Sequence, residues 1–194
     1  MEFSDRFTEP TREADSPREA QPAAQSPDEL FDVCDENDVV VGQATRGEVH
    51  RRNLIHRAVH ILVVRSSGEV VLQMRSAAKD QFPSTWTSSA SGHVDAGESY
   101  DQAARRELAE ELGFDAATIA GLQSIAKDSA CIETGWEHVM VYRLRTDAPL
   151  TPDPVEIERL EERSLDAWLA AYHRQPAAFS PSVYLLEKYA AELR

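Results

Sequence analysis

Residues 92–114 read GHVDAGESYDQAARRELAEELGF, and the rest of the chain is best interpreted outward from this stretch. Its second part predicts a helix from Ser99 to Gly113. Ser99 is followed three residues later by Gln102, which is the capping-box pattern of a helix start, and a glycine suits the left-handed position just past a helix end. Apolar side chains recur every four residues along this helix, so one side of it must pack on a core. This stripe consists of Tyr100, Ala104, Leu108 and Leu112.

Three glutamates follow one another on the same helix at positions 107, 110 and 111. Spacings of three and four residues place their side chains on one side of the helix, within an arc of roughly 100° that borders the apolar stripe. Like charges this close destabilise a bare helix by a few tenths of a kcal/mol per pair, whereas a bound divalent cation would reverse the sign of that effect. Carboxylate oxygens are the ligands that Mg²⁺ and Mn²⁺ prefer. The alternative interpretation is a solvated acidic face in an acidic protein.

The residues around the three glutamates favour a metal site over a solvated acidic face. The segment resembles the Nudix box, G-x5-E-x7-R-E-U-x-E-E-x-G-U with U apolar, and it matches at every fixed position. Those positions are Gly92, Glu98, Arg106, Glu107, Leu108, Glu110, Glu111, Gly113 and Phe114. Residues 92–114 are therefore called the box segment below. The match is specific for the family and carries no information about the substrate.

In the Nudix family this box is a loop–helix–loop that binds the catalytic metal, Mg²⁺ or Mn²⁺. The resemblance implies metal ligands at Glu107, Glu110, Glu111, His93 and the backbone carbonyl near Gly92. It also implies that Glu98 and Arg106 hold the loop and the helix in register. A carboxylate that the metal leaves free could take a proton from water, and both Glu107 and Glu137 remain candidate bases. The candidate catalytic residues are thus Glu98, Arg106, Glu107, Glu110 and Glu137.

A second resemblance, to the branch that contains isopentenyl-diphosphate isomerase and related uncharacterised hydrolases, covers most of residues 30–194. It rests on Val39–Val64, Arg75–Lys79, Phe82–Thr87, Gly92-His93 and Phe179-Ser180-Pro181. In the isomerase a cysteine precedes the Gly-His pair and transfers a proton to carbon, but this chain has Ser91 there. A hydroxyl is a far weaker acid than a thiol. The isomerase also has a degraded box, so both departures favour hydrolysis.

The same branch uses histidines as metal ligands. His56 and His93 match two of those positions, His50 matches a third with a one-residue shift, and Glu137 aligns with a carboxylate that serves both metal and catalysis there. His60 follows His56 by four residues, which is ~13 Å along a strand and too far to share one ion. For each histidine except His93, we weigh an ordinary packed or surface role above a ligand role.

Charge and composition limit the partners. The net charge of −14 should repel nucleic acid and anionic membranes, so the expected partner is a small-molecule diphosphate. Its approach needs local positive charge, and the resemblance assigns diphosphate contact to Arg75 and Lys79. Two well-separated cysteines, Cys34 and Cys131, give no zinc or disulfide framework and suit a cytoplasmic location. Oligomeric state stays open, with a homodimer among the alternatives.

The proline-rich, acidic residues 1–28 are expected to form a disordered tail, and residues 29–194 one Nudix-like domain. Expected strands cover 30–35, 39–42, 57–65, 69–74, 85–91, 121–127, 137–144 and 156–162. Ser164 is expected to cap a helix, and Ser180-Pro181 to open the last one. Strands that alternate with a few helices indicate an α/β (α+β) class, with a mixed sheet sandwiched between helices.

The leading hypothesis is a metal-dependent hydrolase that cleaves a diphosphate linkage in a nucleoside, alcohol or isoprenoid diphosphate. The alternatives are an isopentenyl-diphosphate isomerase, which Ser91 disfavours, and a ligand sensor without turnover, which the complete set of carboxylates disfavours. The loops outside the box choose the substrate in this family, so the sequence does not identify it.

Overall fold

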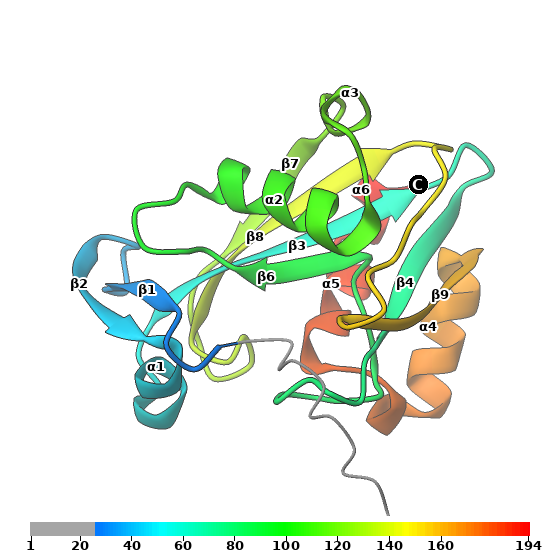
Figure 1. Ribbon diagram of the computed structural model, residues 1–194. Coiled ribbons are helices and arrows are strands. Elements are labelled where there is room, and N and C mark those ends of the chain that lie inside the picture. Colours follow the sequence, from blue (N-terminus) through cyan, green and yellow to red (C-terminus); the bar gives the residue numbers. More distant parts are fainter. Residues whose placement is uncertain (1–25) are drawn as a thin grey trace, which may run out of the picture.

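The computed structural model describes residues 26–194 (Figure 1). The prediction of a disordered tail falls on residues that lie almost entirely outside this range. Within it, the predicted fold class is confirmed: a mixed sheet lies between two layers of helices. No helix in residues 26–194 combines the length and apolar character that crossing a bilayer requires.

The strands are β1 Leu30–Cys34, β2 Val40–Thr45, β3 His56–Val64, β4 Glu69–Arg75, β5 Trp86–Thr87, β6 Ala90–His93, β7 Gln123–Asp128, β8 Glu137–Arg145 and β9 Ile157–Ser164. The α-helices are α1 Arg46–Arg52, α2 Tyr100–Leu112, α3 Ala116–Ile119, α4 Leu165–Arg174, α5 Tyr184–Lys188 and α6 Ala190–Leu193, with 3₁₀ turns at Pro176–Ala178 and Pro181–Val183. Most strand predictions hold to within a few residues, but the expected strand 85–91 is two short strands separated by Ser88 and Ser89.

Strand β3 lies at the centre of the larger sheet, which has seven strands within the described residues. It runs parallel to β8 along its whole length. On its other edge it pairs first with β6 and, at Val63 and Val64, with β4. This change of partner leaves β6 covering only the first half of β3, which matters for the site because β6 carries the start of the box segment.

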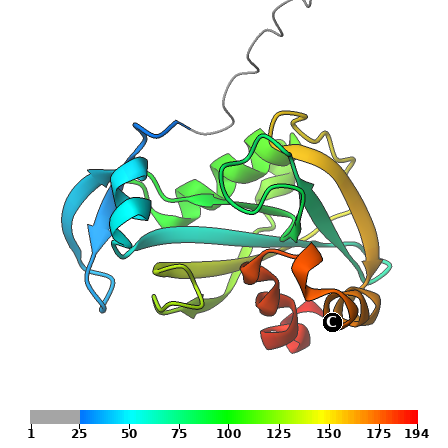
Figure 2. The same cartoon turned by 90° about the horizontal axis from the view of Figure 1, so that it is seen from below.

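Alternate residues of β3 pack on opposite layers, as a strand buried on both faces requires. Val59, Ile61 and Val63 belong to the core under α2, whereas Leu62 and Val64 belong to the core under α4, α5 and α6. Figure 2 shows these two helical layers on opposite sides of the sheet. Strands β1 and β2 form a separate hairpin beside α1 at one end (Figure 1).

The predicted box helix is confirmed as α2. Ser99 and Gln102 form the full capping box, and Gly113 ends the helix at φ 69°, a left-handed conformation that favours glycine. Ser164 caps α4 as predicted. The predicted cap at Ser180 is wrong, because its side chain makes no capping hydrogen bond and Pro181 opens a 3₁₀ turn. The short helix α1 was not predicted.

Candidate active site

Strand β6 divides the candidate site into two cavities that share lining residues of this strand. Ser91 and His93 pair with His60 and Ala58 of β3, and directly paired residues project to the same face of a sheet. Gly92 projects to the opposite face, where a Cβ atom would lie 1.9 Å from Glu107 Oε1. The box carboxylates therefore lie on one side of β6, and the Ser91 and His93 side chains on the other.

The box side is a polar cleft of about 390 Å³ lined by the three glutamates of α2. Glu107 and Glu111 are only 8% and 2% exposed, because they face β6. Glu111 Oε2 accepts hydrogen bonds from the backbone N–H of Ser91 at 3.1 Å and from the Gln73 side chain at 2.9 Å. Glu110 differs, since its side chain is 61% exposed at the rim of the cleft.

Burial raises the pKa of Glu107, and the neighbouring Glu111 carboxylate raises it further. Burial also raises the pKa of Glu111, although Lys79 and the Ser91 N–H oppose the effect. Two buried carboxyl groups that resist ionisation together form a site whose charge a divalent cation would balance. The donor set fits a hard cation such as Mg²⁺ or Mn²⁺, since it offers carboxylate oxygens.

Arg106 ties the two ends of the box segment together. Its guanidinium donates to both Glu98 oxygens at 3.0 and 3.1 Å and to the His93 carbonyl at 3.0 Å. It also donates to Glu107 at 2.6 Å. One side chain thus fixes the loop, the end of β6 and a buried carboxylate, which is the orienting geometry expected for the Glu98–Arg106 pair.

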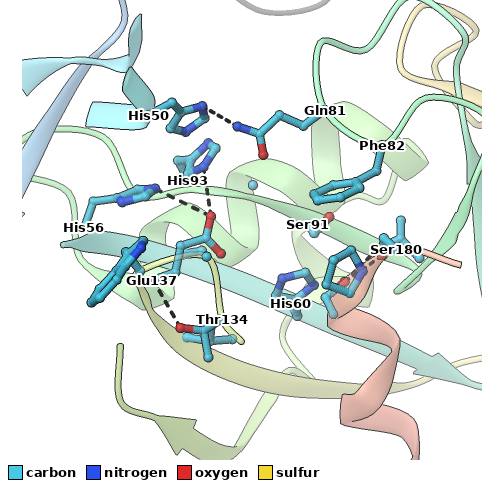
Figure 3. Close-up of a pocket in the computed structure, with 18 of the residues that line it drawn as sticks. His50, His56, His60, Gln81, Phe82, Ser91, His93, Thr134, Glu137 and Ser180 are labelled. Carbon is cyan, nitrogen blue, oxygen red and sulfur yellow. Dashed lines mark hydrogen bonds and ion pairs between the residues drawn. The ribbon is translucent and has the colours of Figure 1, made fainter. Parts of the chain in front are cut away.

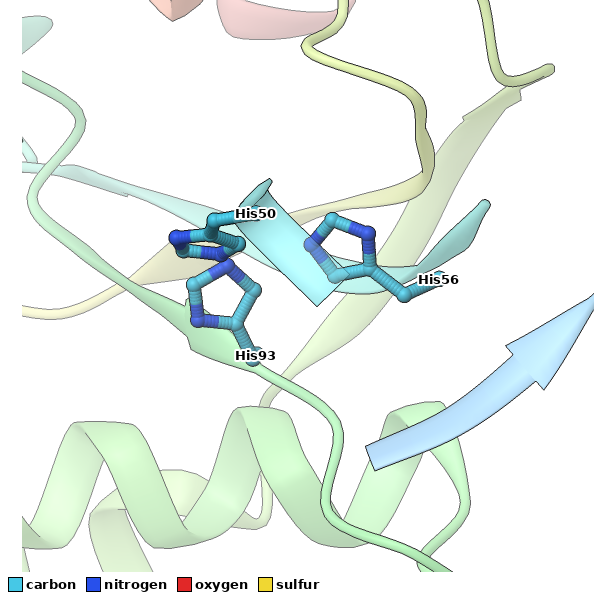
Figure 4. A group of neighbouring side chains, drawn as sticks. All are labelled: His50, His56 and His93. Carbon is cyan, nitrogen blue, oxygen red and sulfur yellow. The ribbon is translucent and has the colours of Figure 1, made fainter. Parts of the chain in front are cut away.

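On the opposite side of β6, three histidines from three segments come together (Figures 3 and 4). His50 lies on α1, His56 starts β3 and His93 ends β6. Their ring centroids are 5.0–5.5 Å apart, and one nitrogen of each lies within 4.8 Å of the others. Glu137 at the start of β8 completes the group, with Oε1 3.2 Å from His93 Nε2 and 3.5 Å from His56 Nε2.

The His56 ring tests whether this group suits a metal. Its Nδ1 lies 2.9 Å from the Leu54 carbonyl, so Nδ1 donates to that carbonyl and Nε2 is the nitrogen that points toward Glu137. That Nε2 is buried and makes no acceptable hydrogen bond within the described residues. A histidine that binds metal typically donates its other nitrogen to a carbonyl, which is the arrangement that His56 has.

The protonation states within this group also suit a bound metal. Burial lowers the pKa of His50, and it lowers that of His93 to about 4. Burial raises the pKa of Glu137, but the contacts with His56 and His93 outweigh it and keep that pKa well below its usual range. The neutral imidazoles of His50 and His93 beside the ionised Glu137 carboxylate form a donor set for a transition metal or zinc.

Three basic side chains, Arg46, Arg75 and Lys79, line the two cavities. Arg46 is 3% exposed, lines both cavities and bonds His93 Nδ1 at 3.1 Å and both oxygens of Asp80. Arg75 lines the histidine cavity, and Lys79 lines the cleft and forms an ion pair with Glu156. Burial lowers the pKa of both side chains. The chain therefore brings three cations close to the carboxylates.

Sequence reasoning found most of these residues and missed two features. Arg46 was not singled out, and the helix that carries His50 was not predicted. A signal for that helix existed, because Thr45 and Glu48 follow the spacing of a capping box, and Thr45 does accept a hydrogen bond from the Glu48 N–H at 3.3 Å. Arg46 has no comparable sequence signal, since its role depends on where α1 packs.

Comparisons with known proteins agree with this geometry. The sequence model of the NUDIX domain matches residues 54–181. An uncharacterised Nudix hydrolase of Streptomyces coelicolor is 37% identical over 161 residues, covering 80% of this chain and 87% of that protein. An isopentenyl-diphosphate Delta-isomerase of Nocardia farcinica is 36% identical over 162 residues, covering 77% and 87%. A crystal structure of a Deinococcus radiodurans protein superposes with a TM-score of 0.73 at 30% identity, covering 82% of this chain and 98% of that one.

Proposed function

The chain belongs to the Nudix family and is a hydrolase that acts on phosphorus-containing anhydrides, and from that premise we propose that it cleaves a diphosphate linkage in a small molecule with the help of Mg²⁺ or Mn²⁺. The observation that carries the proposal is the pair of buried carboxylates, Glu107 and Glu111, held against the backbone of β6. With Glu110 at the rim, they would hold the cation.

A metal bound there would neutralise charge on the phosphate oxygens and lower the pKa of a coordinated water. The protein's own cations support the same task. Arg46 and Arg75 line the histidine cavity and Arg46 and Lys79 line the cleft, so a diphosphate that spans the two would meet a positive side chain on each side. Guanidinium groups bind phosphate oxygens in pairs, which also orients the substrate.

Two carboxylates compete for the role of general base. Glu107 is hydrogen-bonded to Arg106 inside the box, and Glu137 lies among the histidines. A pH profile of kcat separates them. Glu107→Gln and Glu137→Gln are compared with wild type at saturating metal, and the variant that loses the acidic limb identifies the base.

The central experiment measures phosphate release from a panel of nucleoside, alcohol and isoprenoid diphosphates with Mg²⁺ or Mn²⁺. Glu110→Gln and Glu111→Gln should lower kcat/KM by at least roughly 100-fold. Glu158→Gln serves as a matched control, because Glu158 lies exposed on β9 and its carboxylate pairs with the exposed Arg159. Equal activity in wild type and both box variants would refute the proposed metal role.

A second candidate function is isomerisation of isopentenyl diphosphate. It is favoured by the group of His50, His56, His93 and Glu137, and by the similarity to a protein named as that isomerase. Ser91 lines both cavities and offers a hydroxyl where proton transfer to carbon needs a stronger acid. We therefore expect no allylic isomer after incubation with isopentenyl diphosphate and metal, and its appearance would favour the isomerase.

A further inference from the structure

The histidine cavity extends beyond the metal-ligand candidates to a fourth histidine. The alternate residues His56, Ala58 and His60 of β3 all line this cavity of about 470 Å³, and Figure 3 labels His56 and His60 among its walls. His60 is 8% exposed and lies outside the group that could share one ion. None of the roles proposed above uses it.

The hydrogen bonds of His60 decide which atom it offers to the cavity. Its Nδ1 lies 2.8 Å from Ser88 Oγ, and the Ser88 hydroxyl donates to the Ala90 carbonyl. With the Ser88 hydroxyl proton directed at that carbonyl, Ser88 Oγ accepts from His60 Nδ1, and this arrangement favours the tautomer that carries its proton on Nδ1. Burial lowers the pKa of His60 to about 4, so the ring is neutral near pH 7. Its Nε2 therefore faces the cavity as an acceptor, with no hydrogen-bond partner among residues 26–194.

Hydroxyl groups line the same part of the cavity. Ser180 Oγ donates to Thr87 Oγ1 at 3.0 Å and lies 2.9 Å from Ser182 Oγ, and Ser182 Oγ lies 3.1 Å from Thr87 Oγ1. All three residues line the cavity, as His60 does. A hydrocarbon chain against this wall would remove water from several polar groups without replacing its hydrogen bonds.

The rest of the cavity lining includes three exposed apolar side chains. Phe82 is 48% exposed, Ile132 is 71% exposed and Trp136 is 36% exposed. All three line the same cavity. Large apolar groups left in contact with solvent around a cavity are a common feature of ligand sites. The cavity thus offers apolar contact together with a wall of hydrogen-bonding groups.

We infer that His60 is a specificity-determining residue, which selects substrates whose organic group carries a hydrogen-bond donor such as an amino or hydroxyl group and rejects pure hydrocarbon chains. The inference rests on the proposed diphosphate hydrolase function and narrows its substrate class. Sites built to hydrogen-bond a substrate group discriminate strongly against analogues that lack it, because the buried acceptor is then left unpaired.

The test uses ligands that differ in one donor. Dimethylallyl diphosphate is compared with its 4-hydroxy derivative, and geranyl diphosphate with its 8-hydroxy derivative, for wild type, His60→Leu and the control His173→Leu. His173 is a suitable control because it lies exposed on α4. Binding is measured calorimetrically with Mg²⁺ present, and phosphate release is measured separately. His60→Met replaces His60→Leu if circular dichroism shows that the leucine variant is unfolded.

We expect wild type and His173→Leu to bind the donor-bearing member of at least one pair roughly 10- to 100-fold more tightly. His60→Leu should reduce that preference to within about threefold, mainly by weakening the donor-bearing ligand. No preference in wild type, or a preference that survives in His60→Leu, overturns the inference. If wild type prefers donor-bearing ligands but releases no phosphate, the hydrolase proposal is overturned. If it hydrolyses both members of each pair equally well, only the role of His60 is overturned.

Discussion

The carboxylate of Glu107 occupies the space beside Gly92 that any other residue would need for its side chain. A Cβ atom on Gly92 would lie 1.9 Å from Glu107 Oε1 and 2.3 Å from Glu107 Cδ. This close approach lets α2 press its acidic side directly against the backbone of β6, so the first glycine of the box segment sets the position of its first buried carboxylate.

Gly92→Ala should therefore displace Glu107 and leave the fold largely intact. Overpacking of this kind destabilises a domain by about 1–3 kcal/mol, whereas a displacement of about 1 Å at a catalytic group lowers activity roughly 100-fold. Phosphate release and thermal unfolding of the variant would be measured together. Gly42→Ala is the matched control, because a Cβ there meets no atom within 4 Å; equal activity of the two variants would contradict the prediction.

Arg106→Lys should lower both activity and stability. A lysine ammonium cannot reach Glu98, Glu107 and the His93 carbonyl at once, as the planar guanidinium does. We expect the free energy of unfolding to fall by about 1–3 kcal/mol and kcat to fall at least tenfold. The neighbouring Arg105→Lys, which loses one hydrogen bond to the Ile119 carbonyl, should change either quantity little. Similar effects in the two variants would argue against the orienting role.

Metal binding at the histidines should be separable from metal binding at the box. Co²⁺ is a suitable probe because its visible absorption reports nitrogen ligation. His56→Gln should weaken the Co²⁺ absorption titration at least tenfold, since it removes the buried Nε2 that faces Glu137. Glu110→Gln should leave this absorption unchanged, and the exposed His173→Gln serves as the control. A His56→Gln titration that matches wild type would show that the histidines do not hold the metal.

Acid should destabilise the protein partly through His60. Burial lowers the pKa of His60 from 6.5 to about 4, so between these values the unfolded chain binds a proton that the folded chain does not. The contribution of His60 to the free energy of unfolding is therefore present above about pH 6.5 and is lost as the pH drops toward 4. Between about pH 7.5 and pH 5 the loss from this group is on the order of 2 kcal/mol.

Urea unfolding of wild type and His60→Gln at the two pH values measures this contribution. The variant lacks the titrating ring, so its loss of stability on acidification should be smaller by about that amount. Other histidines remain in both proteins and cancel in the comparison. An identical pH dependence would mean that folding does not lower the pKa of His60, which would contradict its burial as a neutral ring.

Local patterns predicted the elements whose signals lie within one continuous stretch. The box helix was predicted from its cap at Ser99, its glycine at 113 and its apolar stripe, and all three are present. The helix that carries His50 escaped because seven residues are too few for a periodic pattern. The cap expected at Ser180 was wrong because a Ser-Pro pair opens a 3₁₀ turn as readily as an α-helix, and only packing decides between them.

The sequence by itself determined the family, the fold class and the cluster of box carboxylates, since each depends on patterns within continuous stretches of the chain. The tertiary structure alone decided that Glu107 and Glu111 are buried while Glu110 is exposed. It also decided that His50, His56 and His93 meet beside Glu137, and that Arg46 lies between the two cavities. These contacts are made between residues of α1, β3, β6 and β8. The distances between separate elements depend on how the sheet and its helices pack, and the spacing of residues within one stretch does not determine them.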